Sequence, residues 1–160
     1  MREFDDNGLL LCKYQAEIFE QSPIKAECSS MIFLRRFFKS NFAKELDKGE
    51  SVLFSLDVNE AFEDIEKEFG PSKYGKVKYS ADVLFWVGYI TRYISYTRNF
   101  SSSLVYKTFP PKLLLDSYPG FHTQGEEWVI ANLLEMQGLT EQYFDPNYRL
   151  KEALRKYIHS

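Results

Sequence analysis

Residues 81–100 read ADVLFWVGYITRYISYTRNF, and this stretch decides the fold class. Ser80 precedes it as a candidate helix N-cap. At 100° per residue, the side chains at positions 83–87 (VLFWV) point in all directions around the helix axis. We therefore expect the first half of this helix to be surrounded by protein, which makes residues 80–98 the central helix of the fold.

The second half of this helix is more polar on one side. Arg92 and Arg98 share an arc with small hydroxyl residues, opposite an arc of aromatic and aliphatic side chains. We expect the helix to emerge from the core here, with Tyr89 and Tyr96 beside the guanidinium of Arg92. The alternative is that Arg92 pairs with a carboxylate. On the first reading, truncation of the enclosed residues Phe85 or Trp86 destabilises the protein far more than truncation of Arg92 or Tyr96.

The remaining sequence predicts further helices. Residues 8–21 form a first helix that we expect to end at Pro23, and residues 31–46 carry apolar side chains at helical spacing. The apolar run at 52–56 fits either a lone strand or an extended linker. Strand-like runs do not alternate with helices, so a parallel sheet has no support. The prediction is an all-α fold of six to eight helices, as one compact domain over residues 1–160.

Composition excludes several classes of protein. The longest uncharged apolar run, residues 83–91, is about half the ~20 residues that a helix needs to cross a bilayer, so no membrane association is expected. Cys12 and Cys28 have neither metal-site spacing nor a nearby histidine pair, which predicts no metal site and favours a reducing, cytoplasmic location. No cofactor-binding motif is present, and no cofactor is predicted.

No catalytic motif of a common enzyme class is present either, which favours a non-enzymatic role. His122 is the one candidate acid–base histidine, in a turn that could hold an anion with Arg92, Tyr96 and Lys107. The simpler alternative is that His122 and Tyr118 hydrogen-bond to each other. No catalytic residue is assigned, and the candidate partner-binding or ligand-binding residues are Tyr89, Arg92, Tyr96, Lys107, Tyr118 and His122.

Charge argues against nucleic acid as the main partner. Basic residues between 35 and 44 lie among aromatic ones, a combination that can bind single strands. However, the acids at 60–68 offset them, and the chain has 20 basic and 23 acidic residues, for a formal charge of −3. The acidic face itself is typical of a solvated surface, with a metal or a basic partner as the alternative.

The blocks CSSMIFLRRFFKSNFAKELD and ADVLFWVGYITRYISYT, followed by SSSLVYK and YPGFHT, resemble a family of uncharacterised small helical bacterial proteins. That family is associated with mobile elements and with gene neighbours of toxin–antitoxin type. The resemblance covers about residues 25–135, and no catalytic or binding residue carries over from it. The family pattern often has Trp where Ile94 stands here, so this chain lacks one aromatic residue of that pattern.

The resemblance implies a cytoplasmic role in binding a protein partner, for example an antitoxin-like regulator. Together with the surplus of aromatic residues, 17% of the chain, it favours a non-enzymatic protein-interaction module, with homo-oligomerisation left open. The alternative is an enzyme that handles a small molecule or nucleotide, with a pocket formed by Arg92, Tyr96 and His122 at the exposed end of the central helix.

Overall fold

The computed structural model describes residues 1–50 and 57–159, and within these ranges every regular element is helical. Nine α-helices and one 3-10 helix are present in the described residues, with no strand among them, which confirms the all-α prediction. The predicted strand or linker at 52–56 lies outside the described residues.

The helices group into two compact units, Met1–Thr123 and Gln124–Ser160. The single domain expected over residues 1–160 therefore stays a prediction, and each unit is described by itself. The first unit contains α1 (Asp6–Lys25), α2 (Ser30–Lys39), α3 (Asn41–Asp47), α4 (Val58–Phe69), α5 (Ala81–Arg98), α6 (Ser102–Thr108) and α7 (Pro111–Phe121). The second contains α8 (Glu126–Met136), the 3-10 helix η2 (Glu141–Phe144) and α9 (Pro146–His159).

The first helix continues beyond Pro23, so the expected end at this proline is wrong. Proline has no N–H with which to bond the carbonyl four residues earlier, that of Phe19. The hydroxyl of Ser22 donates to this same carbonyl oxygen at 2.7 Å and so satisfies it. The helix therefore keeps its hydrogen bonding across the proline and ends at Lys25.

The helix predicted over residues 31–46 is two helices, α2 and α3, which is why the structure has one helix more than the expected upper number. Ser40 separates them in an extended conformation. Its hydroxyl donates to the Phe37 carbonyl at 2.7 Å and accepts from the Ala43 amide at 3.0 Å. One serine therefore ends α2 and caps α3, a role that Ser favours over a helix interior.

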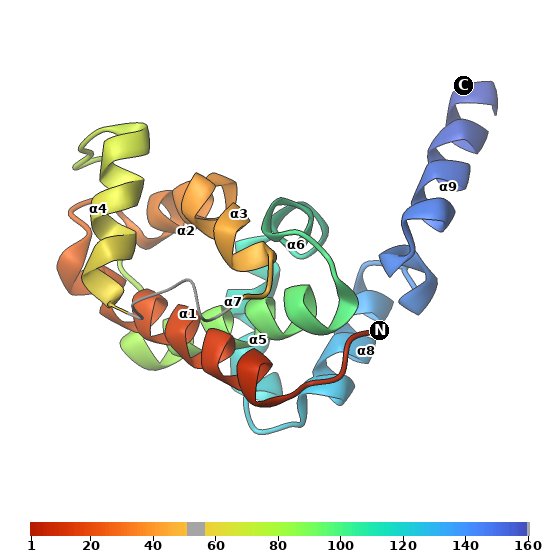
Figure 1. The fold of residues 1–160 in the computed structure, drawn as a ribbon, viewed down its shortest axis with the longest axis horizontal. Coiled ribbons are helices and arrows are strands. Elements are labelled where there is room, and N and C mark those ends of the chain that lie inside the picture. The colour runs from red at the N-terminus through yellow and green to blue at the C-terminus, as the bar shows by residue number, and fades with distance from the viewer. Residues whose placement is uncertain (51–56, 160) are drawn as a thin grey trace. The chain divides into compact units, whose positions relative to one another are not determined.

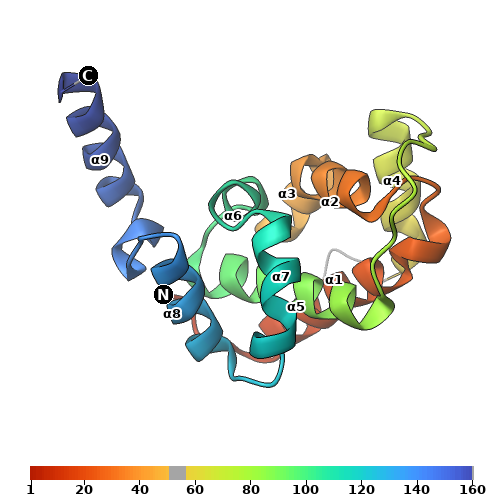
Figure 2. The ribbon, with the colours of Figure 1, turned by 180° about the vertical axis from the view of Figure 1, so that it is seen from behind.

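Helices α1 and α5 form an antiparallel pair along the first unit, visible from both sides in Figures 1 and 2. The two backbones approach closely at Gly88. A Cβ placed on Gly88 would lie 2.9 Å from Ala16 Cα and 2.9 Å from Gln15 O. Helix α7 contacts α5 as well, and Figure 2 shows it in front of α5. The absent side chain at position 88 thus allows the central pair to pack.

Aromatic side chains fill the core between α1 and α2. Phe19 of α1 is fully buried, and its ring packs edge to face on Phe33, Phe37 and Phe38 at centroid distances of 5.8, 4.8 and 5.7 Å. Edge-to-face pairs of this kind stabilise a core beyond the area that they bury. These contacts account for much of the phenylalanine in the region 33–42.

The central helix begins where the sequence predicts, because Ser80 caps it through the Val83 amide at 3.4 Å. The expectation that the first half of this helix is enclosed and that its second half emerges from the core is wrong. Every residue from Ile90 to Arg98 is buried, whereas Phe85 and Trp86 in the first half are only partly so. The reason is that α1, α3 and α6 all contribute partners to the polar arc of the second half, so that arc faces protein.

In the second unit, α9 has no buried residue. Pro146 is its first residue and Asp145 caps it, accepting from the Asn147 amide at 2.9 Å. Arg149 donates to the Tyr143 carbonyl of η2 at 2.6 Å, which connects the two elements.

We predict that Gly88→Ala lowers the free energy of unfolding by about 1–3 kcal/mol, because the new methyl group must displace helix backbone. Gly120→Ala is the matched control: it lies in α7 with no atom within 4 Å of an added Cβ. It should be neutral or stabilise by less than about 1 kcal/mol. Chemical denaturation of both variants measures the difference, and equal stability of the two would contradict the close approach at Gly88.

Candidate functional site

The six candidate residues from the sequence do not form one site. Arg92 and Tyr96 are buried in α5, with 1% and 5% of their surfaces exposed. Lys107 is exposed on α6. Tyr89, Tyr118 and His122 line a hollow beside the first half of α5. The pocket expected from Arg92, Tyr96 and His122 together is therefore wrong, since neither Arg92 nor Tyr96 lines the hollow that contains His122.

Arg92 is held by polar groups from four helices. Its Nε donates to Gln15 Oε1 of α1 at 2.7 Å, and Nη1 donates to Asp47 Oδ1 of α3 at 2.8 Å. Its Nη2 donates to Ser102 Oγ of α6 at 2.8 Å, and Nη1 also reaches Ser95 Oγ, within α5, at 3.2 Å. The alternative considered from the sequence, that Arg92 pairs with a carboxylate, is confirmed.

Asp47 completes this cluster from the other side. Its Oδ2 accepts from the Ser102 amide at 2.9 Å, and its Oδ1 accepts from the Ser102 hydroxyl at 2.6 Å. The Asp47 side chain is 17% exposed and that of Arg92 is 1% exposed. A buried ion pair with this many hydrogen bonds is costly to break, because a single removed partner leaves a charge without compensation. Arg92 therefore has a structural role.

Tyr96 also belongs to the packing of the fold. Its hydroxyl donates to Asp5 Oδ1 at 2.6 Å, and the Arg2 guanidinium lies 4.5 Å from its ring centroid. The cation over this ring is Arg2, while the guanidinium of Arg92 is bonded to Gln15, Asp47 and Ser102. The hydrogen bond from Tyr96, with a second one from the Gly8 amide, lowers the pKa of Asp5 below its ordinary value.

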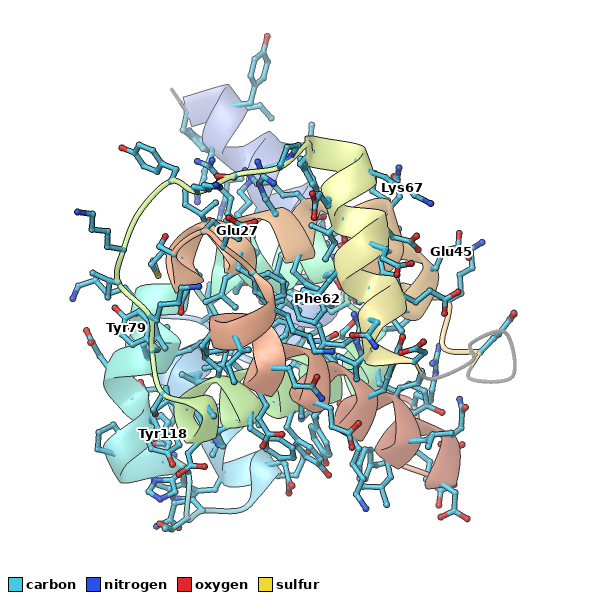
Figure 3. The ribbon with its side chains drawn as sticks, turned by 90° about the vertical axis from the view of Figure 1, so that its left-hand side faces the viewer. Glu27, Glu45, Phe62, Lys67, Tyr79 and Tyr118 are labelled. Atoms are coloured by element: carbon cyan, nitrogen blue, oxygen red, sulfur yellow. The ribbon has the colours of Figure 1, made fainter. Side chains whose placement is uncertain are left out.

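The aromatic hollow is the feature of the first unit that best fits a binding site. Its volume is about 470 Å³. Its described lining residues are Glu20 of α1, Asp82, Phe85, Trp86 and Tyr89 of α5, Tyr118 of α7, and His122. Figure 3 shows Tyr118 on the side where the loop 71–80 leads into α5.

Helical spacing brings the α5 residues of this hollow together. Asp82, Phe85, Trp86 and Tyr89 occupy positions i, i+3, i+4 and i+7, which lie on one face of a helix. This face is only partly buried. The sequence contained this signal, but the apolar side chains all around residues 83–87 led to the expectation that the whole first half is enclosed.

Ring contacts hold Trp86, Tyr118 and His122 in place at the hollow. Trp86 packs edge to face on Tyr118, with centroids 5.8 Å apart and an interplanar angle of 72°. The His122 ring stacks on Tyr118 at 4.2 Å and 14°. Three rings from α5 and the end of α7 are thereby held in one arrangement, and each pair contributes about 0.5–1.5 kcal/mol beyond its buried area.

His122 does not offer a free backbone amide to an anion. It is the C-cap of α7, and its amide donates to the Tyr118 carbonyl at 3.0 Å. Its Nδ1 lies 2.7 Å from the same oxygen. The amide is therefore already used by the fold. The hydrogen bonding between His122 and Tyr118 that was the simpler alternative is confirmed, through the backbone carbonyl of Tyr118.

A second hollow of about 510 Å³ lies between α3 and α4. It is mainly acidic, and its described lining residues are Asn41, Phe42, Glu45, Glu60, Asp64, Lys67 and Glu68. Figure 3 shows Glu45 and Lys67 on this side of the molecule. No group of three or more metal-ligating side chains suited to a metal ion occurs among residues 1–50 and 57–159.

No protein-family model, no curated protein and no solved structure matches this chain. Within the described residues, no helix is both long enough and apolar enough to span a membrane. The likeness to the bacterial family therefore stays a prediction, and the functional argument depends on the geometry of the hollow.

We predict that Arg92→Ala lowers the free energy of unfolding by about 3–5 kcal/mol, because Asp47 loses its cation in a mostly buried position. Trp86→Ala should cost less, since Trp86 is only partly buried. Lys107→Ala, on the exposed face of α6, is the control and should change stability by no more than about 0.5 kcal/mol. Circular-dichroism melts and urea titrations give the order, and a Trp86→Ala variant that is the least stable would contradict it.

Proposed function

We propose that this protein is a cytoplasmic, non-enzymatic protein-interaction module that binds its partner through the aromatic hollow at the start of α5. The observation that carries the proposal is a cluster of partly buried aromatic rings, Phe85, Trp86, Tyr89 and Tyr118, around one hollow. Trp and Tyr are the residues most enriched at the energetic centre of protein interfaces.

The hollow has the properties of a preformed site. The contacts of Trp86 and His122 with Tyr118 hold the rings in place before any partner arrives. Little conformational entropy is then lost on binding, which favours affinity. A hollow of about 470 Å³ lies within the ordinary range for ligand sites and could accommodate one or two side chains of a partner.

An antitoxin-like role is one form of this function, and it rests on the family resemblance alone. In that form, the partner is a toxin protein encoded beside this one, and occupancy of the hollow is part of neutralising it. The buried positions of Cys12 and Cys28 fit a reducing compartment, in which thiols persist. The enzymatic alternative loses its main support, because Arg92 is bound by Asp47 and Gln15 and does not line the hollow.

We predict that tagged wild-type protein captures a stoichiometric protein partner from a lysate of the organism that encodes it. Trp86→Ala and Tyr118→Ala should lose this partner, because each removes an aromatic wall of the hollow. Tyr74→Ala is the matched control, since Tyr74 is 76% exposed in the same unit and does not line the hollow. Mass spectrometry of the captured protein gives the stoichiometry.

Circular dichroism must show that each variant is folded. The proposal fails if folded wild-type protein captures no stoichiometric partner. It also fails if the Trp86 and Tyr118 variants capture the partner as well as the Tyr74 variant does.

A further inference from the structure

We propose that the aromatic hollow selects an organic cation, namely a guanidinium or ammonium group that enters between its rings. The inference deepens the proposed function, because the cation would then be a Lys or Arg side chain of the partner. A small free cation shares the same chemistry, and the experiment below separates the two sources.

The walls of the hollow supply the attraction for a cation. Phe85, Trp86, Tyr89 and Tyr118 are aromatic, and an aromatic face carries partial negative charge that attracts a cation within about 6 Å of the ring centroid. Trp is the strongest of these rings for such contacts. Several rings around one hollow are an arrangement that proteins use for organic cations, and the planar, weakly hydrated guanidinium stacks well on aromatic faces.

The charged residues that line the hollow also favour a cation. Glu20 of α1 and Asp82 of α5 both line it, and no Lys or Arg is among its described lining residues. Two carboxylates at an aromatic site favour a cation and disfavour an anion, and they can accept hydrogen bonds from its N–H groups.

Two lysines that are near Glu20 and Asp82 in the sequence donate hydrogen bonds to other groups of the fold. Lys78, on the loop that leads to α5, donates to the Pro23 carbonyl at 2.9 Å and also to the Ala26 carbonyl. Lys25, at the end of α1, donates to Asn59. These two cations are held by other groups of the fold, and no ion pair found among the described residues includes Glu20 or Asp82.

The chain already contains one example of this chemistry. At Tyr96, the Arg2 guanidinium lies 4.5 Å from the ring centroid, and the Asp5 carboxylate accepts from the phenol at 2.6 Å. There a guanidinium of this chain lies against a tyrosine ring whose hydroxyl is bonded to a carboxylate. The hollow offers the same types of group, with more rings, on an accessible surface.

The test uses the full chain with Trp128→Phe, which leaves Trp86 as its one tryptophan and hence as a fluorescent reporter in the hollow. Arginine amide and citrulline amide are titrated at constant ionic strength. The two have nearly the same shape, but only the first is a cation on its side chain. We expect saturable quenching with arginine amide and about tenfold weaker binding of citrulline amide.

Charge variants test whether arginine amide binds at the aromatic hollow. Glu20→Gln with Asp82→Asn should weaken the binding of arginine amide, while Glu45→Gln with Asp64→Asn, which removes two carboxylates from the acidic hollow between α3 and α4, should not. Circular-dichroism melts establish that both variants are folded. A titration with tetramethylammonium shows whether a free cation without N–H groups is bound as well.

The results separate the two proposals. Equal binding of arginine and citrulline amides, no saturable change, or equal weakening by both pairs of substitutions would overturn the cation site, even if Trp86→Ala still loses a protein partner. Saturable cation binding with no partner captured would support the cation site with a free small molecule as its source, and the proposed protein-binding function would fail.

Discussion

The buried ion pair between Arg92 and Asp47 is the interaction on which the rest of the first unit depends. Arg92 lies in the middle of the central helix with 1% of its surface exposed, and hydrogen bonds link it to α1, α3 and α6. A guanidinium in such a place must have its donors satisfied, because an unpaired buried charge costs several kcal/mol. The positions of these helices are therefore coupled to one side chain.

The two halves of α5 therefore have different roles. Its second half supplies the polar cluster and is enclosed by other helices, so its side chains are committed to the fold. In its first half, Phe85, Trp86 and Tyr89 are only partly buried and line a hollow. Aromatic residues that the core does not need are thus left at a surface, where we infer that they bind a partner.

Local features of this fold could be predicted from the sequence, and long-range ones could not. Ser80 caps its helix as expected because a cap depends on the next two or three residues. Arg92 was expected near the surface because its partner Asp47 is 45 residues away. A usable signal existed: residues 81–98 contain no Lys or Glu, the residues that usually cover a solvated helix face. Likewise, Tyr89, Tyr118 and His122 were selected as candidates, but only the fold shows that they share a hollow that excludes Arg92.

The most direct test of this account is a double-mutant cycle on Arg92 and Asp47, made with Arg92→Met and Asp47→Asn. Urea denaturation gives the free energy of unfolding of the wild type, both single variants and the double variant. We predict that the double variant is more stable than the sum of the single losses implies, by about 1–3 kcal/mol, because removing both charges leaves neither one buried alone. Additive losses, within about 0.5 kcal/mol, would contradict the central role of this ion pair.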